Sequence, residues 1–137
     1  MKSKRFSSST QTACPCGSNH PYALCCEPLH QGLNHATTVE ALMRSRYSAY
    51  VLRLTAYVAQ TWHSSTRPQD LDLGEDQTKW LGLNVIRAFD GEQLDEAFVE
   101  FVAKFKIGGQ GVQRLHETSR FIRENDRWFY VDGVFIE

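Results

Sequence analysis

All four cysteines of this chain lie in one short segment, CPCGSNHPYALCC, which runs from Cys14 to Cys26. A disulfide framework is one interpretation, because four cysteines allow three pairings, but neighbours such as Cys25 and Cys26 pair only with strained geometry. A redox dithiol is a second interpretation, although its usual C-x-x-C spacing is absent from the sequence. We favour a third interpretation, a zinc site in which four thiolates surround the metal as a tetrahedron.

The residues between the cysteines suit a closed metal site. Pro15 fixes φ between the first two thiols, and Gly17 permits a tight turn in which backbone N–H groups approach the sulfur atoms. Residues 21–24, PYAL, are expected to form one helical turn that presents Cys25 and Cys26, since proline is favoured at the first helical position. Because such a segment has almost no core of its own, metal binding would have to drive its folding.

Two histidines offer alternative ligands. His20 lies between the two cysteine pairs, and His30 follows them. Either imidazole could replace a thiolate, but the set of four cysteines is already complete, and we favour it. A complete protein ligand set leaves no open position on the metal, so the site is expected to be structural rather than catalytic.

The pattern C-P-C-G-S-x(6)-C-C resembles the SEC-C motif, the small zinc module at the C-terminus of the preprotein translocase motor SecA. The resemblance implies that the Zn²⁺ ligands are Cys14, Cys16, Cys25 and Cys26, and that the module contacts a partner protein. The usual glycine is replaced by Asn19, which tolerates positive φ, and the usual lysines are replaced by His20 and Pro21. With those lysines missing and a formal net charge of −1 for the chain, nucleic acid is not expected as a partner.

A second set of candidates surrounds the segment VQRLHETSRFI, residues 112–122. In a strand, alternation places Leu115, Glu117 and Phe121 on one face, and the apolar members direct that face inward. A buried carboxylate is costly unless it is paired or neutral, so Glu117 is the first candidate for a cavity residue.

Two roles are open for Glu117. With His63 it could form an acid–base pair in a pocket that also contains Trp62 and Tyr130. Alternatively, it pairs with Arg44 or Arg46 and fixes a helix on the sheet, with a lowered pKa. We favour the structural role. The sequence contains no phosphate-binding loop, no H-E-x-x-H motif and no nucleophile elbow, so a catalytic residue is not assigned.

The elements that position these residues follow from capping signals and periodicity. Thr37 and Glu40 form a predicted capping box for a helix over residues 40–53, and Thr55 is the predicted N-cap of a second helix over 56–63. Residues 64–76 are expected to form a loop. Four segments rich in aromatic and β-branched residues predict an antiparallel meander, with turns at Asp90-Gly91, residues 108–111 and Asn125-Asp126: residues 80–89, 97–105, 112–122 and 127–136. Helices on one face of such a sheet predict an α+β fold.

The larger part of the chain also resembles a known family. The runs LMRSRY, TWH, WLGL, SRF and W-x-Y-x-D-G resemble the YchJ-like family, in which a SEC-C module precedes a nuclear-transport-factor-2-like (NTF2-like) domain. The resemblance covers Cys14 to the C-terminus and implies two to three helices packed on a curved, cone-like sheet of about four strands. The expected organisation is a flexible tail over residues 1–12, a zinc module over 13–30 and an NTF2-like domain over 31–137.

The overall composition narrows the functional class. Hydrophobic residues make up 42% of the 137 residues and charged residues 23%, as in ordinary globular proteins. No apolar run approaches the roughly 20 residues that span a bilayer, and the basic N-terminus lacks an apolar signal region, so we expect a cytoplasmic protein without membrane contact. We predict a binding module that takes a partner protein through its zinc site or a small apolar ligand. The alternative is an enzyme that uses Glu117 and His63.

Overall fold

The computed structural model describes residues 12–137, so the predicted flexible tail lies, except for Thr12, outside the described residues. The elements are, in chain order, a 3-10 turn η1 (Tyr22–Leu24), the helices α2 (Glu27–His30), α3 (Val39–Leu52) and α4 (Thr55–Gln60), and the strands β1 (Thr78–Asp90), β2 (Glu96–Ile107), β3 (Gln113–Glu124) and β4 (Arg127–Phe135).

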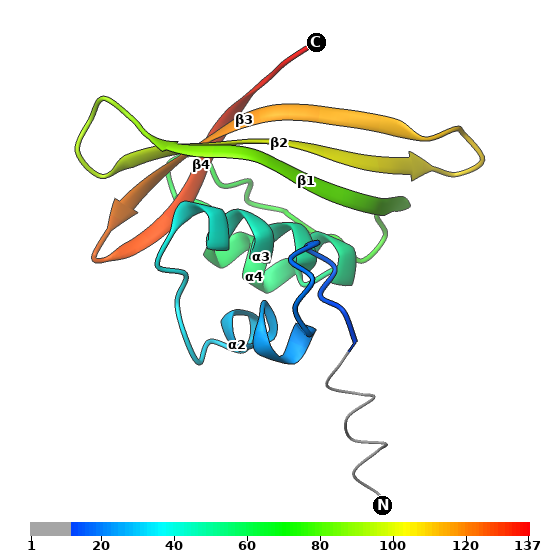
Figure 1. Cartoon of the computed structure of the whole chain (residues 1–137), viewed down its shortest axis with the longest axis horizontal. Coiled ribbons are helices and arrows are strands. Elements are labelled where there is room, and N and C mark those ends of the chain that lie inside the picture. Colours follow the sequence, from blue (N-terminus) through cyan, green and yellow to red (C-terminus); the bar gives the residue numbers. More distant parts are fainter. Residues whose placement is uncertain (1–11) are drawn as a thin grey trace, which may run out of the picture.

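The four strands form one antiparallel sheet in the order β1-β2-β3-β4, and the helices lie together on one face of it (Figure 1). The register shifts within β1, between Trp80 and Gly82 and again between Val85 and Arg87, and once between β3 and β4 beside Val131. Such bulges bend and twist a strand, which curves the sheet around the helices. The predicted α+β fold of helices on a four-stranded sheet is confirmed.

The turns between the strands are where the sequence places them. Asn125 and Asp126 both have positive φ, 53° and 66°, as a two-residue hairpin of the mirror-image type requires. Gly108 has φ 58° at the end of β2, and Gly91 N donates to Glu96 O across the first hairpin at 2.8 Å. Each turn joins neighbouring strands, so no crossover connection is needed.

Two predicted helix caps are wrong by one residue. Thr38, not Thr37, caps α3, because its Oγ1 accepts the Ala41 N–H at 3.1 Å, while Glu40 pairs with Arg44 one turn further on. Thr55 is the first residue of α4 rather than its cap, and its Oγ1 accepts the Leu73 N–H at 3.0 Å. Thr55 therefore anchors the following loop to α4.

Helix α3 lies at the centre of the molecule, between the sheet and the N-terminal segment (Figure 1). One buried cluster joins Leu42, Met43 and Tyr47 of α3 to the inner face of the sheet and also includes three of the cysteines. The cysteine segment (residues 13–30) therefore shares the core of the larger domain. The expected boundary between residues 30 and 31 stays a prediction. Among the helices of residues 12–137, none is long and apolar enough to cross a membrane.

Candidate metal centre and cavity

The two cysteine pairs are held by a small hairpin and a helical turn. Cys14 N donates to His20 O at 2.9 Å and Tyr22 N to Thr12 O at 2.8 Å, so the chain doubles back between the pairs. Gly17 and Asn19 have positive φ, 82° and 70°, which closes the tight turn. The 3-10 turn η1 then presents the second pair, as the sequence predicts for residues 21–24.

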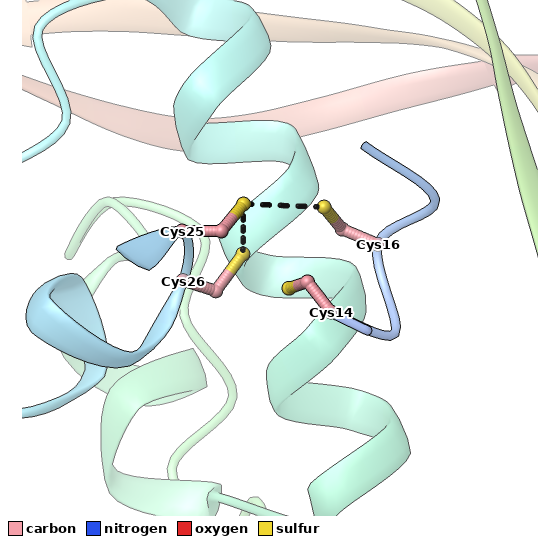
Figure 2. Close-up of side chains that lie close together, drawn as sticks. All are labelled: Cys14, Cys16, Cys25 and Cys26. Carbon is pink, nitrogen blue, oxygen red and sulfur yellow. Dashed lines mark hydrogen bonds between the residues drawn. The ribbon is translucent and has the colours of Figure 1, made fainter. Parts of the chain in front are cut away.

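The four sulfur atoms converge on one point in front of α3 (Figure 2). All lie within 4.8 Å of one another, with Sγ–Sγ distances of 3.7 Å for Cys16–Cys25 and 3.9 Å for Cys25–Cys26. Disulfide sulfurs lie about 2.05 Å apart, so these thiols are not bonded to each other. A tetrahedron with Zn–S bonds of about 2.3 Å has edges of about 3.8 Å. The separations therefore fit a metal held by four thiolates.

Neighbouring side chains orient the sulfur atoms. The Ser48 hydroxyl on α3 contacts the sulfurs of Cys14 and Cys26 at 3.5 and 3.4 Å, and Ser18 Oγ contacts Cys25 Sγ at 3.2 Å. Hydrogen bonds from the Cys14 and Cys26 side chains lower the pKa of Cys16. The pKa of Cys26 is raised by its hydrogen bonds with Cys14 and Cys16, and burial raises the pKa of Cys25, so a bound cation would have to stabilise these two thiolates.

Arg44 provides a positive charge beside the cysteines. Its Nη1 donates to the Cys16 carbonyl at 2.8 Å and its Nε to Glu40 Oε2 at 3.0 Å. Burial acts to lower the pKa of Arg44, but the bond to Glu40 and the negative charge of Cys16 outweigh it and raise the pKa. A metal with four thiolates carries a net negative charge, which Arg44 partly offsets.

His30 is used as a structural residue. Burial raises the pKa of the Tyr22 hydroxyl to about 12, so that hydroxyl stays protonated and donates to His30 Nδ1 at 2.7 Å. His30 Nε2 then donates to the Ser45 carbonyl at 2.8 Å, and burial lowers the pKa of the imidazole. With both ring nitrogens engaged, His30 is not available as a ligand. His20 is exposed and does not belong to the converging group.

A cavity of about 240 Å³ lies between α3 and the inner face of the sheet. The predicted pocket residues Trp62, Glu117 and Tyr130 line it, whereas His63 does not. His63 Nε2 lies 3.0 Å from Glu124 Oε2, and its Nδ1 lies 2.7 Å from Ser65 Oγ. The structure thus separates His63 from Glu117, and the proposed acid–base pair has no geometric support.

Glu117 points inward, as strand alternation predicts, and is 7% exposed. The expected ion pair with Arg44 or Arg46 is wrong: Glu117 Oε2 accepts the Ser119 hydroxyl at 2.7 Å, and no ion pair of residues 12–137 includes it. The expected lowering of the pKa of Glu117 is also wrong. Burial is the largest influence on this pKa and raises it. Its carboxyl group lies over Gly133, where any side chain would collide with it.

Arg46 lines the cavity, whereas the sequence predicts it only as a possible partner of Glu117. It is 5% exposed, and its Nη1 donates to Val58 O at 2.9 Å and Thr61 Oγ1 at 2.8 Å. Its Cζ lies 4.6 Å from the ring centroid of Tyr130 and 5.1 Å from that of Trp62. A signal was present, because Arg46 interrupts the apolar face of α3 one turn after Met43. The position of Ser48 in the sequence does not predict its contact with the cysteines.

Comparisons with known proteins agree with this architecture. Residues 38–133 match the family model described as YchJ, middle NTF2-like domain, and residues 12–28 match the SEC-C motif. A UPF0225 protein from Chromobacterium violaceum is 50% identical over 137 residues, which covers 98% of each chain.

Two solved structures are also similar. The solution structure of a SEC-C motif containing protein from Rhodopseudomonas palustris has a TM-score of 0.80 and 34% identity, and the match covers 92% of this chain and all of that one. The crystal structure of a SEC-C motif containing protein from Psychrobacter arcticus has a TM-score of 0.76 and 31% identity, and the match covers 94% of this chain and 85% of that one.

Proposed function

Because the chain belongs to the YchJ-like family and carries a SEC-C motif beside its NTF2-like domain, we propose that it is a zinc-stabilised protein that binds a small, largely apolar molecule. The cavity between α3 and the sheet is the observation that carries the proposal. Protein interiors are normally close-packed, so a space of about 240 Å³ with mainly apolar walls is a site that a ligand can fill.

The proposed metal is Zn²⁺, held by Cys14, Cys16, Cys25 and Cys26. The sulfur separations of 3.7 and 3.9 Å support tetrahedral thiolate coordination, which zinc favours. When bound, the ion supplies folding free energy to a segment that has little apolar core of its own. The free thiols also support a reducing compartment such as the cytoplasm.

Binding is favoured over catalysis. Within the described residues, the cavity contains one buried carboxyl group, Glu117, and no imidazole. General acid–base catalysis needs a second group placed to exchange the proton, and His63 faces Glu124 instead.

A matched pair of variants tests ligand binding at the cavity. Leu115 lines the cavity, and Leu115→Phe should fill part of it, while Leu81→Phe adds the same ring at a half-exposed position outside it. Ligand-observed NMR with a panel of one-ring and two-ring compounds, charged and neutral, should detect binding to the wild type and Leu81→Phe and weaker binding to Leu115→Phe. Absence of binding across the panel, or equal binding by both variants, would contradict the proposal.

A protein partner is the second candidate, as the SEC-C resemblance implies. Leu24 and Leu33, in and just after the cysteine segment, are 78% and 72% exposed, which supports a contact surface on this side of the molecule. A pull-down that compares the intact protein with Leu24→Ser tests it directly, because Leu24 is not a metal ligand. A partner captured equally by both proteins would exclude Leu24 from the contact.

A further inference from the structure

The charge of Arg46 has no ion-pair partner among residues 12–137, although the ring faces of Trp62 and Tyr130 and the charge of Glu117 stabilise it in part. Burial lowers the pKa of Arg46, but a guanidinium group stays protonated at neutral pH. Its Nη1 donates to Val58 O and Thr61 Oγ1, and a hydrogen bond to Tyr50 accompanies them, but all three acceptors are uncharged. Buried charges are normally paired, so a cation at the wall of a cavity indicates an anion that comes from outside.

A second polar group at the cavity, the indole N–H of Trp80, has no hydrogen-bond partner in the described residues. Trp80 Nε1 is the one buried side-chain nitrogen or oxygen, among the residues that the structure describes, without a hydrogen bond. Trp80 lines the cavity and packs against Tyr50, with 6.2 Å between the ring centroids. An unsatisfied buried donor costs about 1–3 kcal/mol, so it indicates an acceptor that is not part of the chain.

The other residues that line the cavity indicate the shape and polarity of the ligand. Six of the eleven lining residues are aromatic, and these faces come from α3, the end of α4 and three strands: Tyr47, Tyr50, Trp62, Trp80, Phe101 and Tyr130. Flat ring faces favour a flat apolar partner. An engineered cavity of about 150 Å³ admits benzene, so the larger volume here, about 240 Å³, suits one or two fused rings.

We propose that the cavity binds a small organic anion with a flat apolar body, such as an aromatic carboxylate, whose charge pairs with Arg46. The inference rests on the proposed ligand-binding function and adds the chemical class of the ligand. The Trp80 indole donates to an acceptor oxygen of the bound molecule.

The other polar groups at the cavity are compatible with an anion. Burial raises the pKa values of Tyr50 and Tyr130, so both hydroxyls stay protonated and act as donors. Among residues 12–137, Glu117 is the one carboxyl group at the cavity, burial raises its pKa, and its Oε2 accepts the Ser119 hydroxyl at 2.7 Å rather than pairing with Arg46.

The direct test compares two probes that differ in charge and share one ring system, 2-naphthoate and 2-naphthalenemethanol. Isothermal titration calorimetry on the zinc-loaded full chain should give an affinity for 2-naphthoate at least about tenfold higher, since hydrogen bonds to charged groups are worth about 1.5–3 kcal/mol. Arg46→Gln should remove this preference, and Arg46→Lys, which replaces the guanidinium group but keeps the charge, should retain it. In NMR spectra, the Trp80 indole N–H signal should move on binding, and that of Trp128, which does not line the cavity, should stay.

Each outcome decides the inference. Equal affinity for the two probes overturns the anion class but leaves ligand binding intact. Failure of both probes overturns the inference, and only failure of the whole panel described above overturns the proposed ligand binding as well. If the Arg46 variants do not fold, Trp80→Phe replaces them, with Trp128→Phe as its matched control. The expected result is then a several-fold loss of 2-naphthoate affinity in Trp80→Phe alone, and an unchanged affinity overturns the role of Trp80.

Discussion

Glu117 is a buried carboxyl group whose environment favours its neutral form. Burial is the largest influence on its pKa and raises it, and the charge of Asp132 on β4 acts in the same direction. Hydrogen bonds from Ser119 and Tyr130 and the charge of Arg46 on α3 oppose the shift without cancelling it. The sequence predicted the inward direction of this side chain but not its partner. Strand alternation defines which face a residue lies on, but it does not show whether an arginine of α3 comes close enough to form an ion pair.

The raised pKa predicts how Glu117 affects stability. Below the unfolded-state pKa of about 4.3, the carboxyl group is protonated in both states, so its burial costs no ionisation energy. As the pH rises through the higher folded-state pKa, ionisation of the buried group lowers the free energy of unfolding. Glu117→Gln should therefore match the wild type in unfolding free energy near pH 4 and be the more stable protein at higher pH. Urea denaturation at a series of pH values measures this difference. A wild type that gains stability relative to the variant as the pH rises would contradict it.

Glu100 is a control of opposite sign. It lies on the outer face of the sheet, where hydrogen bonds from Arg87 and His116 lower its pKa. Its contribution to stability is present above the unfolded pKa and is lost as the pH falls through the folded pKa. In the same titrations, Glu100→Gln should therefore lose stability at neutral pH and approach the wild type in acid.

Gly133 makes room for the carboxyl group of Glu117, and this can be tested by adding one methyl group. Gly133→Ala should destabilise the protein by about 1–3 kcal/mol, the usual cost of overpacking a core. Gly109→Ala is the control, because a side chain there meets nothing within 4 Å. Removal of the Glu117 side chain in a Gly133→Ala background should reduce the cost, and a fully additive double-mutant cycle would show that the two positions do not interact.

Among the elements, helix α3 contacts both the candidate metal site and the cavity. Ser48 and Arg44 approach the cysteine segment, whereas Met43, Arg46 and Tyr50 line the cavity. The strand segments and hairpin turns could be predicted from sequence because period-two alternation and Asn125-Asp126 are local signals. The caps of α3 and α4 could not be predicted in this way. Glu40 pairs with Arg44, and Thr55 accepts the Leu73 N–H, and these contacts depend on the fold.

Ser48 provides a test of how α3 supports the metal centre. Ser48→Ala removes the hydroxyl that contacts Cys14 and Cys26 and should weaken zinc binding by about 10- to 100-fold, as expected for a residue that orients metal ligands. Competition with a chromophoric chelator measures the affinity. Ser45→Ala is the matched control: Ser45 is equally buried on the same helix but bonds to Leu42 O and the Tyr57 hydroxyl rather than to sulfur. Equal loss in both variants would exclude a specific role for Ser48.

In the whole molecule, the candidate metal site and the sheet share one buried core. Cys14, Cys16 and Cys26 are no more than 4% exposed and pack in the same cluster as Leu42 and Tyr47. A cysteine segment that folded on the metal alone would unfold without the larger domain. The contacts of the cysteine segment with α3 join residues 15 to 34 positions apart, and such contacts leave no local pattern from which the sequence could predict them.

Zinc removal should therefore destabilise the whole chain at once. Calorimetry of the chelated protein should show one cooperative transition at a lower temperature, with a decrease of about 3–5 °C for each kcal/mol lost in a domain of this size. Cys25→Ser should behave in the same way without chelator. Two separate transitions, with the second unchanged from the zinc-loaded protein, would show that the cysteine segment unfolds independently.

The most direct test of the account is the zinc content of the protein purified under reducing conditions without added metal. Native mass spectrometry of the 15.7 kDa chain should show one zinc ion per molecule, and Cys25→Ser should show less under the same conditions. Because four converging thiolates form a closed site, the ion should survive purification. A wild-type protein that carries no zinc, or whose mass shows paired disulfides, would contradict a zinc site formed by the four cysteines.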